Sequence, residues 1–484
     1  MVVRSSIAAN GYVGRVRSDD APPPSRRAAR TSTAPIDPVV VRNREGRQAL
    51  GWVDEETVTG AADTTSASAA APDLLARRPR RSPLRAGVVM PVLTTVGVCG
   101  VYVAATLLWP LWAVAPTVRE ITPDGPVATA SAVTWPAAGA GAAGVAGIDA
   151  VAASSPAPVS MASISKVVTV LMILDEMPLA VGQSGPEFTF TSRDRDTYWD
   201  YLSDDESALD VPVGGSLTEY QMLQGILMGS AGNYTNRLAS SLWPSDEVFA
   251  QAARAWLDRH GLAGITLAEP TGIDPANTAE PAALITLAQL ALANPVVAEI
   301  ARTRTVELPG AGEVTNTNDL LSDPGVVGLK TGSLADFYNL LAAKDITVGT
   351  TTVRVYATAL GQPTGEARDQ ETARLLTEVA AEVSTPKTMP AGTLAGVVST
   401  AWGATANIVT DADAAVILWN GAAATATTTL DLGSARTANA PVGQVLVRGP
   451  LDAVTVGVHL TADIPEPDAW WRLTHPLQLW GLAG

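Results

Sequence analysis

Cysteine, histidine and lysine are scarce in this chain. The scarcity of cysteine and histidine argues against disulfide and metal sites, and the scarcity of lysine makes each buried lysine a candidate for function. The 484 residues include a single cysteine, Cys99, so neither a disulfide framework nor a thiolate metal site can be built from the sequence. The 3 histidines are scattered and lack the spacing of a metal-binding motif. We therefore expect no metal and no other cofactor.

The sequence also lacks the motifs of two common enzyme classes, and its negative charge argues against nucleic acid binding. The sequence has neither a Gly-x-Ser-x-Gly elbow nor a phosphate-binding glycine loop, which argues against a Ser-His-Asp hydrolase and a nucleotide-dependent enzyme. The formal net charge is −16, although residues 1–85 carry an excess of arginine. Because the rest of the chain is strongly acidic, we expect no nucleic acid partner.

The N-terminal part of the chain predicts a membrane anchor. Residues 1–85 are rich in Ala, Pro, Ser, Thr and Arg without periodicity, which predicts a disordered cytoplasmic tail. A charge-free run follows from Ala86 to Val118, and about 20 apolar residues suffice to cross a bilayer. We expect a transmembrane helix over 86–116. A cleaved signal peptide ending at Ala113-Val114-Ala115 is the alternative.

Arginines next to this run predict its orientation. They crowd its N-terminal side, and positive residues favour the cytoplasmic face of a membrane: Arg77, Arg78, Arg80, Arg81 and Arg85. The sequence therefore predicts a single-pass protein of the cell membrane, with the N-terminus in the cytoplasm and everything beyond the helix outside.

The remainder of the chain divides into three parts by composition. Residues 117–143 are rich in Ala, Gly and Pro and predict a tether. Residues 144–385 alternate helical and strand patterns, beginning with a buried strand at Gly144–Ser154, and predict a mixed α/β (α+β) domain. Residues 386–484 contain short β-branched runs between turn residues and predict a small all-β domain.

Ser163 and Lys166 are the first candidates for catalysis. A serine hydroxyl is a poor nucleophile at pH 7 until a base removes its proton, and a neutral lysine can be that base. They stand in Ser163–Met177, which is apolar nearly all round and predicts a buried helix. Positions i and i+3 share a helix face, and burial lowers the pKa of a lysine. A lysine in so apolar a helix needs a reason to be inside.

Two further motifs follow, and with them the chain resembles a known family. Ser230 stands in Gly229–Asn233 (GSAGN), and Lys330 stands in Gly328–Ser333 (GLKTGS). Their order resembles the Ser-x-x-Lys, Ser-x-Asn and Lys-Thr-Gly motifs of the penicillin-binding proteins and serine β-lactamases. Within that superfamily, residues 130–385 look most like the low-molecular-mass D-alanyl-D-alanine carboxypeptidases. The cues are MASISKVVTVLMIL, EPTGIDPANT, NTNDLL and VGLKTG.

The resemblance implies a fold, a reaction and a set of roles. It implies a DD-peptidase/β-lactamase-like domain with helices around an antiparallel sheet. It also implies removal of the terminal D-Ala from peptidoglycan stem peptides through an acyl-enzyme, with β-lactam antibiotics as inhibitors. The resemblance implies that Ser163 is the nucleophile, Lys166 its base and Ser230 a proton relay. It implies that Lys330 and Thr331 bind the substrate carboxylate and that Gly332 allows close approach of the substrate backbone. The backbone N–H groups of Ser163 and Ser333 would bind the oxyanion.

The second motif departs from the family pattern. When Ser230 is set on the family serine, Gly232 stands where asparagine is expected, and Asn233 falls one residue late. On a helix this offset is about 100° of rotation. Asn233 can take the catalytic place only if the local backbone is bulged or shifted. The other reading makes Asn233 an ordinary polar turn residue.

Two other functions stay open at this point. A serine β-lactamase shares these motifs, but it needs a second base for fast deacylation, and no Glu stands in a matching family context. A degenerate, non-catalytic homologue that binds peptidoglycan is the other alternative, and Gly232 is the feature that favours it.

Overall fold

The structure is a computed structural model that describes residues 85–335 and 337–482. The tail predicted for 1–85 therefore lies outside the described residues except for Arg85. The predicted arrangement of helices around an antiparallel sheet is confirmed, and further all-β elements follow toward the C-terminus.

A five-stranded antiparallel sheet is the frame of the domain that carries the three motifs, in the order β11-β12-β13-β2-β3. Its strands are β2 (Ala140–Val145), β3 (Ile148–Ala153), β11 (Val326–Leu334), β12 (Phe337–Val348) and β13 (Thr351–Gln362). The expected single strand at Gly144–Ser154 covers only the end of β2 and all of β3, which form a hairpin with Gly147 at φ 77° in its turn.

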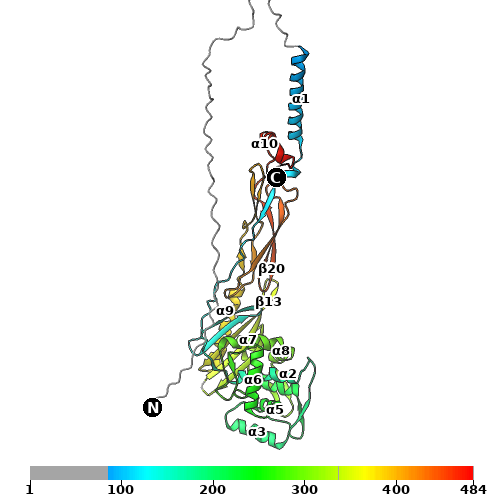
Figure 1. Ribbon diagram of the computed structural model, residues 1–484. Helices are drawn as coiled ribbons and strands as arrows, with labels where there is room; N and C mark the ends of the chain where they lie inside the picture. Colours follow the sequence, from blue (N-terminus) through cyan, green and yellow to red (C-terminus); the bar gives the residue numbers. More distant parts are fainter. Residues whose placement is uncertain (1–84, 336, 483–484) are drawn as a thin grey trace, which may run out of the picture. The chain divides into compact units, whose positions relative to one another are not determined.

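Successive residues of these strands point to opposite faces of the sheet and pack into two separate hydrophobic cores. Leu341 and Ala343 of β12 face α7 (Pro281–Ala293) and the other helices, whereas Leu340 and Ala342 face α9 (Gly365–Val383). Figure 1 shows α7 and α9 near β13.

The remaining helices lie on the α7 side of the sheet with a buried helix, α2 (Ser165–Glu176), whose residues from Ser165 to Leu174 are all buried. They are α3 (Ser192–Ser203), α4 (Glu219–Met228), α5 (Gly232–Leu242), α6 (Asp246–Arg259) and α8 (Pro295–Arg302). Short strands connect them: β4 (Val159–Ser160), β5 (Glu187–Thr189), β6 (Ser216–Thr218), β7 (Ile265–Thr266), β8 (Thr278–Ala279), β9 (Thr305–Leu308) and β10 (Gly312–Thr315).

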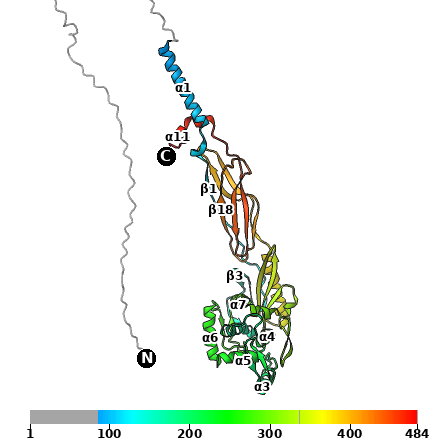
Figure 2. The ribbon, with the colours of Figure 1, turned by 90° about the vertical axis from the view of Figure 1, so that its right-hand side faces the viewer.

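The C-terminal part is an all-β unit with its own hydrophobic core. Its main sheet has the order β1-β15-β16-β20-β19-β18, and Figure 2 shows β1 beside β18. The strands are β1 (Thr117–Glu120), β14 (Lys387–Met389), β15 (Leu394–Ser399), β16 (Thr405–Thr410), β17 (Ala414–Val416), β18 (Thr425–Leu430), β19 (Pro441–Arg448) and β20 (Ala453–Leu460).

Both ends of the region predicted as a tether, residues 117–143, belong to sheets. Its first residues form β1, which pairs with β15, and its last residues form part of β2 in the five-stranded sheet. Small residues at the C-terminal end of this region pack closely, since a Cβ on Gly139 would lie 1.8 Å from the Leu360 carbonyl oxygen. A Cβ on Gly144, just beyond this range, would lie 2.4 Å from Ile285 of α7.

The apolar N-terminal run forms α1 (Ala86–Leu108), which is long and apolar enough to cross a membrane. It ends eight residues before the expected limit of 116 because Trp109 precedes Pro110, and a residue before proline is driven out of the helical region. A 3₁₀ turn, η2 (Leu111–Val114), follows, and α10 (Ala469–Thr474) and α11 (Pro476–Leu479) complete the chain.

Candidate active site

Ser163, the predicted nucleophile, stands just before α2 on a strained turn, which is called the nucleophile turn below. A 3₁₀ turn, η3 (Ala162–Ile164), precedes the helix, so the helix expected from Ser163 begins at Ser165 instead. Ala162 has φ 48°, a left-handed conformation that is costly for a residue with a Cβ. The strained turn leaves Ser163 half-buried, while the rest of the segment is buried.

Lys166 reaches the nucleophile directly. Its Nζ donates hydrogen bonds to Ser163 Oγ at 2.8 Å and to the Thr271 carbonyl at 2.6 Å, and the side chain is 1% exposed. Burial lowers the pKa of Lys166 to about 8, against the opposing fields of Glu269 and Glu206. A substantial neutral fraction of the lysine is therefore present near neutral pH, as a base for serine requires.

The Glu269–Thr278 segment positions the groups around this pair. The Glu269 carboxylate accepts hydrogen bonds from the backbone N–H and hydroxyl of Thr271, both at 2.6 Å, and from the Gly272 N–H at 2.5 Å. Gly272, at φ 84°, lies so close to the nucleophile turn that a Cβ would stand 2.0 Å from the Ala162 carbonyl oxygen. Thr271 and Gly272 thus contact Lys166 and the turn of Ser163, although the motifs did not single them out; both lie in the EPTG segment.

The third motif lies on β11, directly against the nucleophile turn. A Cβ on Gly332 would stand 2.9 Å from the Met161 carbonyl oxygen and 3.2 Å from the Ser163 nitrogen. The expected reason for this glycine was approach of the substrate, whereas the structure shows that it permits approach of the protein's own backbone. Ser333 follows on the strand, so the N–H groups expected to bind the oxyanion are on adjoining elements.

Lys330 and Thr331 face the same region from β11. Lys330 is 1% exposed, and its Nζ donates to the Thr331 carbonyl at 3.0 Å and to its hydroxyl at 3.3 Å. Burial lowers the pKa of Lys330 well below its ordinary value, and the positive charges of Lys166 and Arg368 lower it further. Arg368, on α9, is a nearby cation that the sequence analysis missed because α9 was not predicted.

The second motif is tied to the third through Thr317. Its backbone N–H donates to the Met228 carbonyl at 3.0 Å, and its hydroxyl lies 2.6 Å from that of Thr331. Ser230 follows Met228 closely, is 5% exposed and has φ 58°. Thr317 belongs to the NTNDLL segment, which carried the family resemblance without an assigned role.

Asn233 is not presented to the nucleophile. Helix α5 begins regularly at Gly232, so the bulge that would let Asn233 replace the motif asparagine is not there. The Asn233 side chain instead pairs with the backbone of Leu209, donating to its carbonyl at 2.7 Å and accepting from its N–H at 3.1 Å. The expectation that Asn233 is catalytic is therefore not supported by its geometry.

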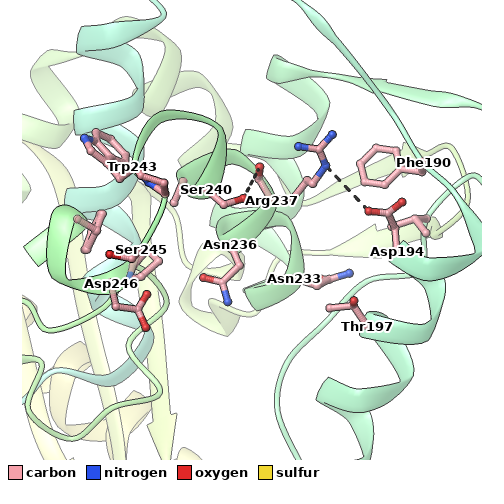
Figure 3. Close-up of a pocket in the computed structure, with 15 residues that line it drawn as sticks. Phe190, Asp194, Thr197, Asn233, Asn236, Arg237, Ser240, Trp243, Ser245 and Asp246 are labelled. Carbon is pink, nitrogen blue, oxygen red and sulfur yellow. Dashed lines mark hydrogen bonds and ion pairs between the residues drawn. The ribbon is translucent and has the colours of Figure 1, made fainter.

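Figure 3 shows Asn233 and Asn236 leaving α5 in different directions, beside a cavity of 360 Å³. The cavity is lined partly by Arg237, which is paired with Asp194 at 4.0 Å. Among residues 85–335 and 337–482, no group of three or more His, Cys, Asp or Glu side chains could hold a metal ion.

Comparison with known proteins gives a family for this part of the chain. Residues 151–362 match the model of the D-alanyl-D-alanine carboxypeptidase family. A comparison with curated proteins gives no match.

Two solved structures illustrate the similarity. The Streptomyces K15 DD-transpeptidase is 23% identical, with a TM-score of 0.45, over 51% of this chain and 100% of its own. Penicillin-binding protein 5 of Haemophilus influenzae is 18% identical, with a TM-score of 0.48, over 69% of this chain and 100% of its own. The resemblance predicted from the motifs is confirmed by the family model: the part of the chain that carries Ser163, Lys166 and Lys330 is similar to the D-alanyl-D-alanine carboxypeptidase family.

Proposed function

We propose that this protein is a serine-type D-alanyl-D-alanine carboxypeptidase that removes the terminal D-Ala from peptidoglycan stem peptides. The observation that carries the proposal is the hydrogen bond of 2.8 Å between Lys166 Nζ and Ser163 Oγ, together with a lysine pKa of about 8. A serine paired with a partly neutral lysine is equipped for acyl transfer without a cofactor.

In the acylation step, Lys166 takes the Ser163 hydroxyl proton as the oxygen attacks the penultimate D-Ala carbonyl. The backbone N–H groups of Ser163 and Ser333 stabilise the developing oxyanion. The C–N bond then breaks, and Ser230 relays a proton to the departing D-Ala amine. Water hydrolyses the resulting ester, which releases the shortened peptide and restores the serine.

The substrate's terminal carboxylate belongs beside β11. Lys330 and the Thr331 hydroxyl are the direct contacts. Arg368 adds little to the attraction, because its guanidinium is paired with the Asp369 carboxylate at 2.8 and 3.1 Å. The low pKa of Lys330 in the free protein reflects a buried cation without a counter-charge, and the arrival of a carboxylate supplies one. A β-lactam carboxylate fits the same contacts, so we expect penicillin to acylate Ser163.

The N-terminal helix completes the proposal. As a single membrane span, α1 would hold the catalytic domain and the all-β unit at the outer face of the cell membrane, where peptidoglycan is found. The positions of the arginines before the span support this orientation.

The test uses the full-length protein with a pentapeptide that ends in D-Ala-D-Ala. We expect release of one D-Ala per peptide and stable labelling by a fluorescent penicillin, both abolished in Ser163→Ala. Rapid turnover of benzylpenicillin, at many cycles per second, would instead identify a β-lactamase. A folded protein with neither D-Ala release nor Ser163-dependent labelling would identify a non-catalytic homologue.

A further inference from the structure

The space beside Gly232 is already filled. A Cβ on Gly232 would lie 2.5 Å from Cε1 of Tyr201, 3.1 Å from its Cδ1 and 3.2 Å from the Ser207 carbonyl oxygen. An asparagine at this position cannot coexist with the tyrosine as it stands. The glycine at position 232 is therefore required by the position of Tyr201, whose ring occupies the space that an asparagine side chain would need.

The segment 201–209 is fastened to the first turns of α5. The Gly232 N–H donates to the Ser207 carbonyl at 2.8 Å, and the Asn233 amide pairs with the backbone of Leu209. Asn236 Nδ2 donates to the Tyr201 hydroxyl. Asn233 thus has a role that its sequence position concealed, since it holds this segment in place.

Tyr201 and Lys166 share the same charged neighbours. The carboxylates of Glu206 and Glu269 act on both groups, raising the pKa of each, and Lys330 is the cation that faces Lys166 from β11. Burial is the largest influence on the lysine and lowers its pKa. The geometric fact is that the Tyr201 ring fills the space beside Gly232, and a ring in that place can limit the access of water to this side of the site.

We propose that Tyr201 takes the place left open by Gly232 and acts as a positioning residue, its ring closing the site beside Lys166. This inference rests on the proposed function, in which Lys166 is the base. Tyr201 acts through the lysine rather than on the substrate. Its hydroxyl stays protonated, because burial and the two carboxylates raise its pKa.

The test measures Lys166 directly, so it does not depend on activity. The chain has only four lysines, and Lys166 can be assigned by NMR of protein carrying ¹³C at lysine Cε, with Lys166→Arg as the reference. Tyr201→Ala should raise the pKa of Lys166 by about one unit, because the ammonium becomes hydrated. At pH 7 the neutral fraction should then fall about tenfold, and with it acylation by fluorescent penicillin.

Three variants serve as controls. Tyr201→Phe keeps the ring and should keep the pKa and the acylation rate within about twofold. Tyr198→Ala makes the same change one turn earlier on α3 and should leave both unchanged. Gly232→Asn should lower the melting temperature and the acylation rate, and Tyr201→Ala in the same chain should restore the melting temperature by making room.

The outcomes separate the two proposals. An unchanged Lys166 pKa in folded Tyr201→Ala, or a double variant no more stable than Gly232→Asn, would overturn the role of Tyr201. A shifted pKa in a protein whose wild type neither releases D-Ala nor is labelled by penicillin would uphold it and reject the proposed function.

Discussion

At the scale of single residues, the pKa of Lys166 sets the expected pH dependence. The base must be neutral, and its pKa of about 8 means that the neutral fraction rises with pH up to and through that value. Acylation by fluorescent penicillin should therefore increase about tenfold per unit between pH 6 and 7 and level off above pH 8.5. Lys166→Arg should lose at least about a thousandfold at all pH values. A rate independent of pH from 6 to 9 would show that another group is the base.

Glu219 is a second buried ionisable group, and its titration should change the stability of the fold with pH. Both of its carboxyl oxygens lack a hydrogen-bond partner among the described residues, and burial raises its pKa to about 7. Between about pH 4.5 and 7 the folded state binds more protons than the unfolded state, so the stability of the wild type falls as the pH rises through this window.

Glu219→Gln stays neutral and should escape this loss. Relative to the wild type, it should gain about 1–3 kcal/mol in the free energy of unfolding between pH 5 and pH 8. Thermal unfolding at the two pH values measures the gain, and Glu176→Gln, an exposed acid on α2, is the matched control. A gain of equal size at both pH values would mean that titration of Glu219 is not the cause.

At the scale of elements, the close contact between β11 and the nucleophile turn is the most sensitive feature. Gly332→Ala would place a Cβ 2.9 Å from the Met161 carbonyl oxygen and 3.2 Å from the Ser163 nitrogen, so one element must move. We expect acylation to fall about a hundredfold, because a displacement of about 1 Å at a reacting group costs that much.

The control for Gly332→Ala is Gly365→Ala at the first residue of α9, where the nearest atom to the new Cβ is 3.9 Å away. Its acylation rate should be that of the wild type. Melting temperatures show whether either variant is folded. A Gly332→Ala variant with full activity would mean that the two elements can separate without displacing the oxyanion donors.

Elements with clear periodicity could be predicted from the sequence, and elements defined by packing could not. The start of α8 is marked in the sequence by Asn294 and Pro295, and in the structure the Asn294 side chain accepts hydrogen bonds from the backbone N–H groups of Val296 and Val297. Most of strand β2 was missed because its Ala and Gly residues resemble a linker. Their small size is explained only by the close packing of the strand against α7. Helix α9 was missed although Thr364 is a good N-cap, so that signal was present.

The candidate site divides in the same way. Ser163, Lys166 and Lys330 could be predicted because their spacing and the scarcity of lysine single them out. Tyr201 and Arg368 could not, since they come from helices distant in sequence and only the tertiary fold brings them to the site. Asn233 was misplaced because one residue of offset on a helix turns a side chain toward a different neighbour, here Leu209.

At the scale of the whole molecule, the charge before α1 predicts its orientation in the membrane. Arginines within about 20 residues of a span hold that end in the cytoplasm, whereas more distant charges have little effect. In protoplasts, an external protease should remove the catalytic domain and spare a tag at the N-terminus, and in inverted vesicles the two should exchange. Loss of the tag from a mature, shortened protein would instead indicate a cleaved signal peptide.

Charge substitution tests the cause of that orientation. Replacing the five arginines next to the span by glutamine should increase the inverted fraction severalfold, since no cation then remains within about 20 residues of the span to resist transfer of the N-terminus. The matched control changes the same number of charges far from the span: Arg4, Arg15, Arg17, Arg26 and Arg27. An equal effect of both sets would show that total tail charge, rather than proximity, sets the topology. No effect of either set would show that the folded exterior decides it.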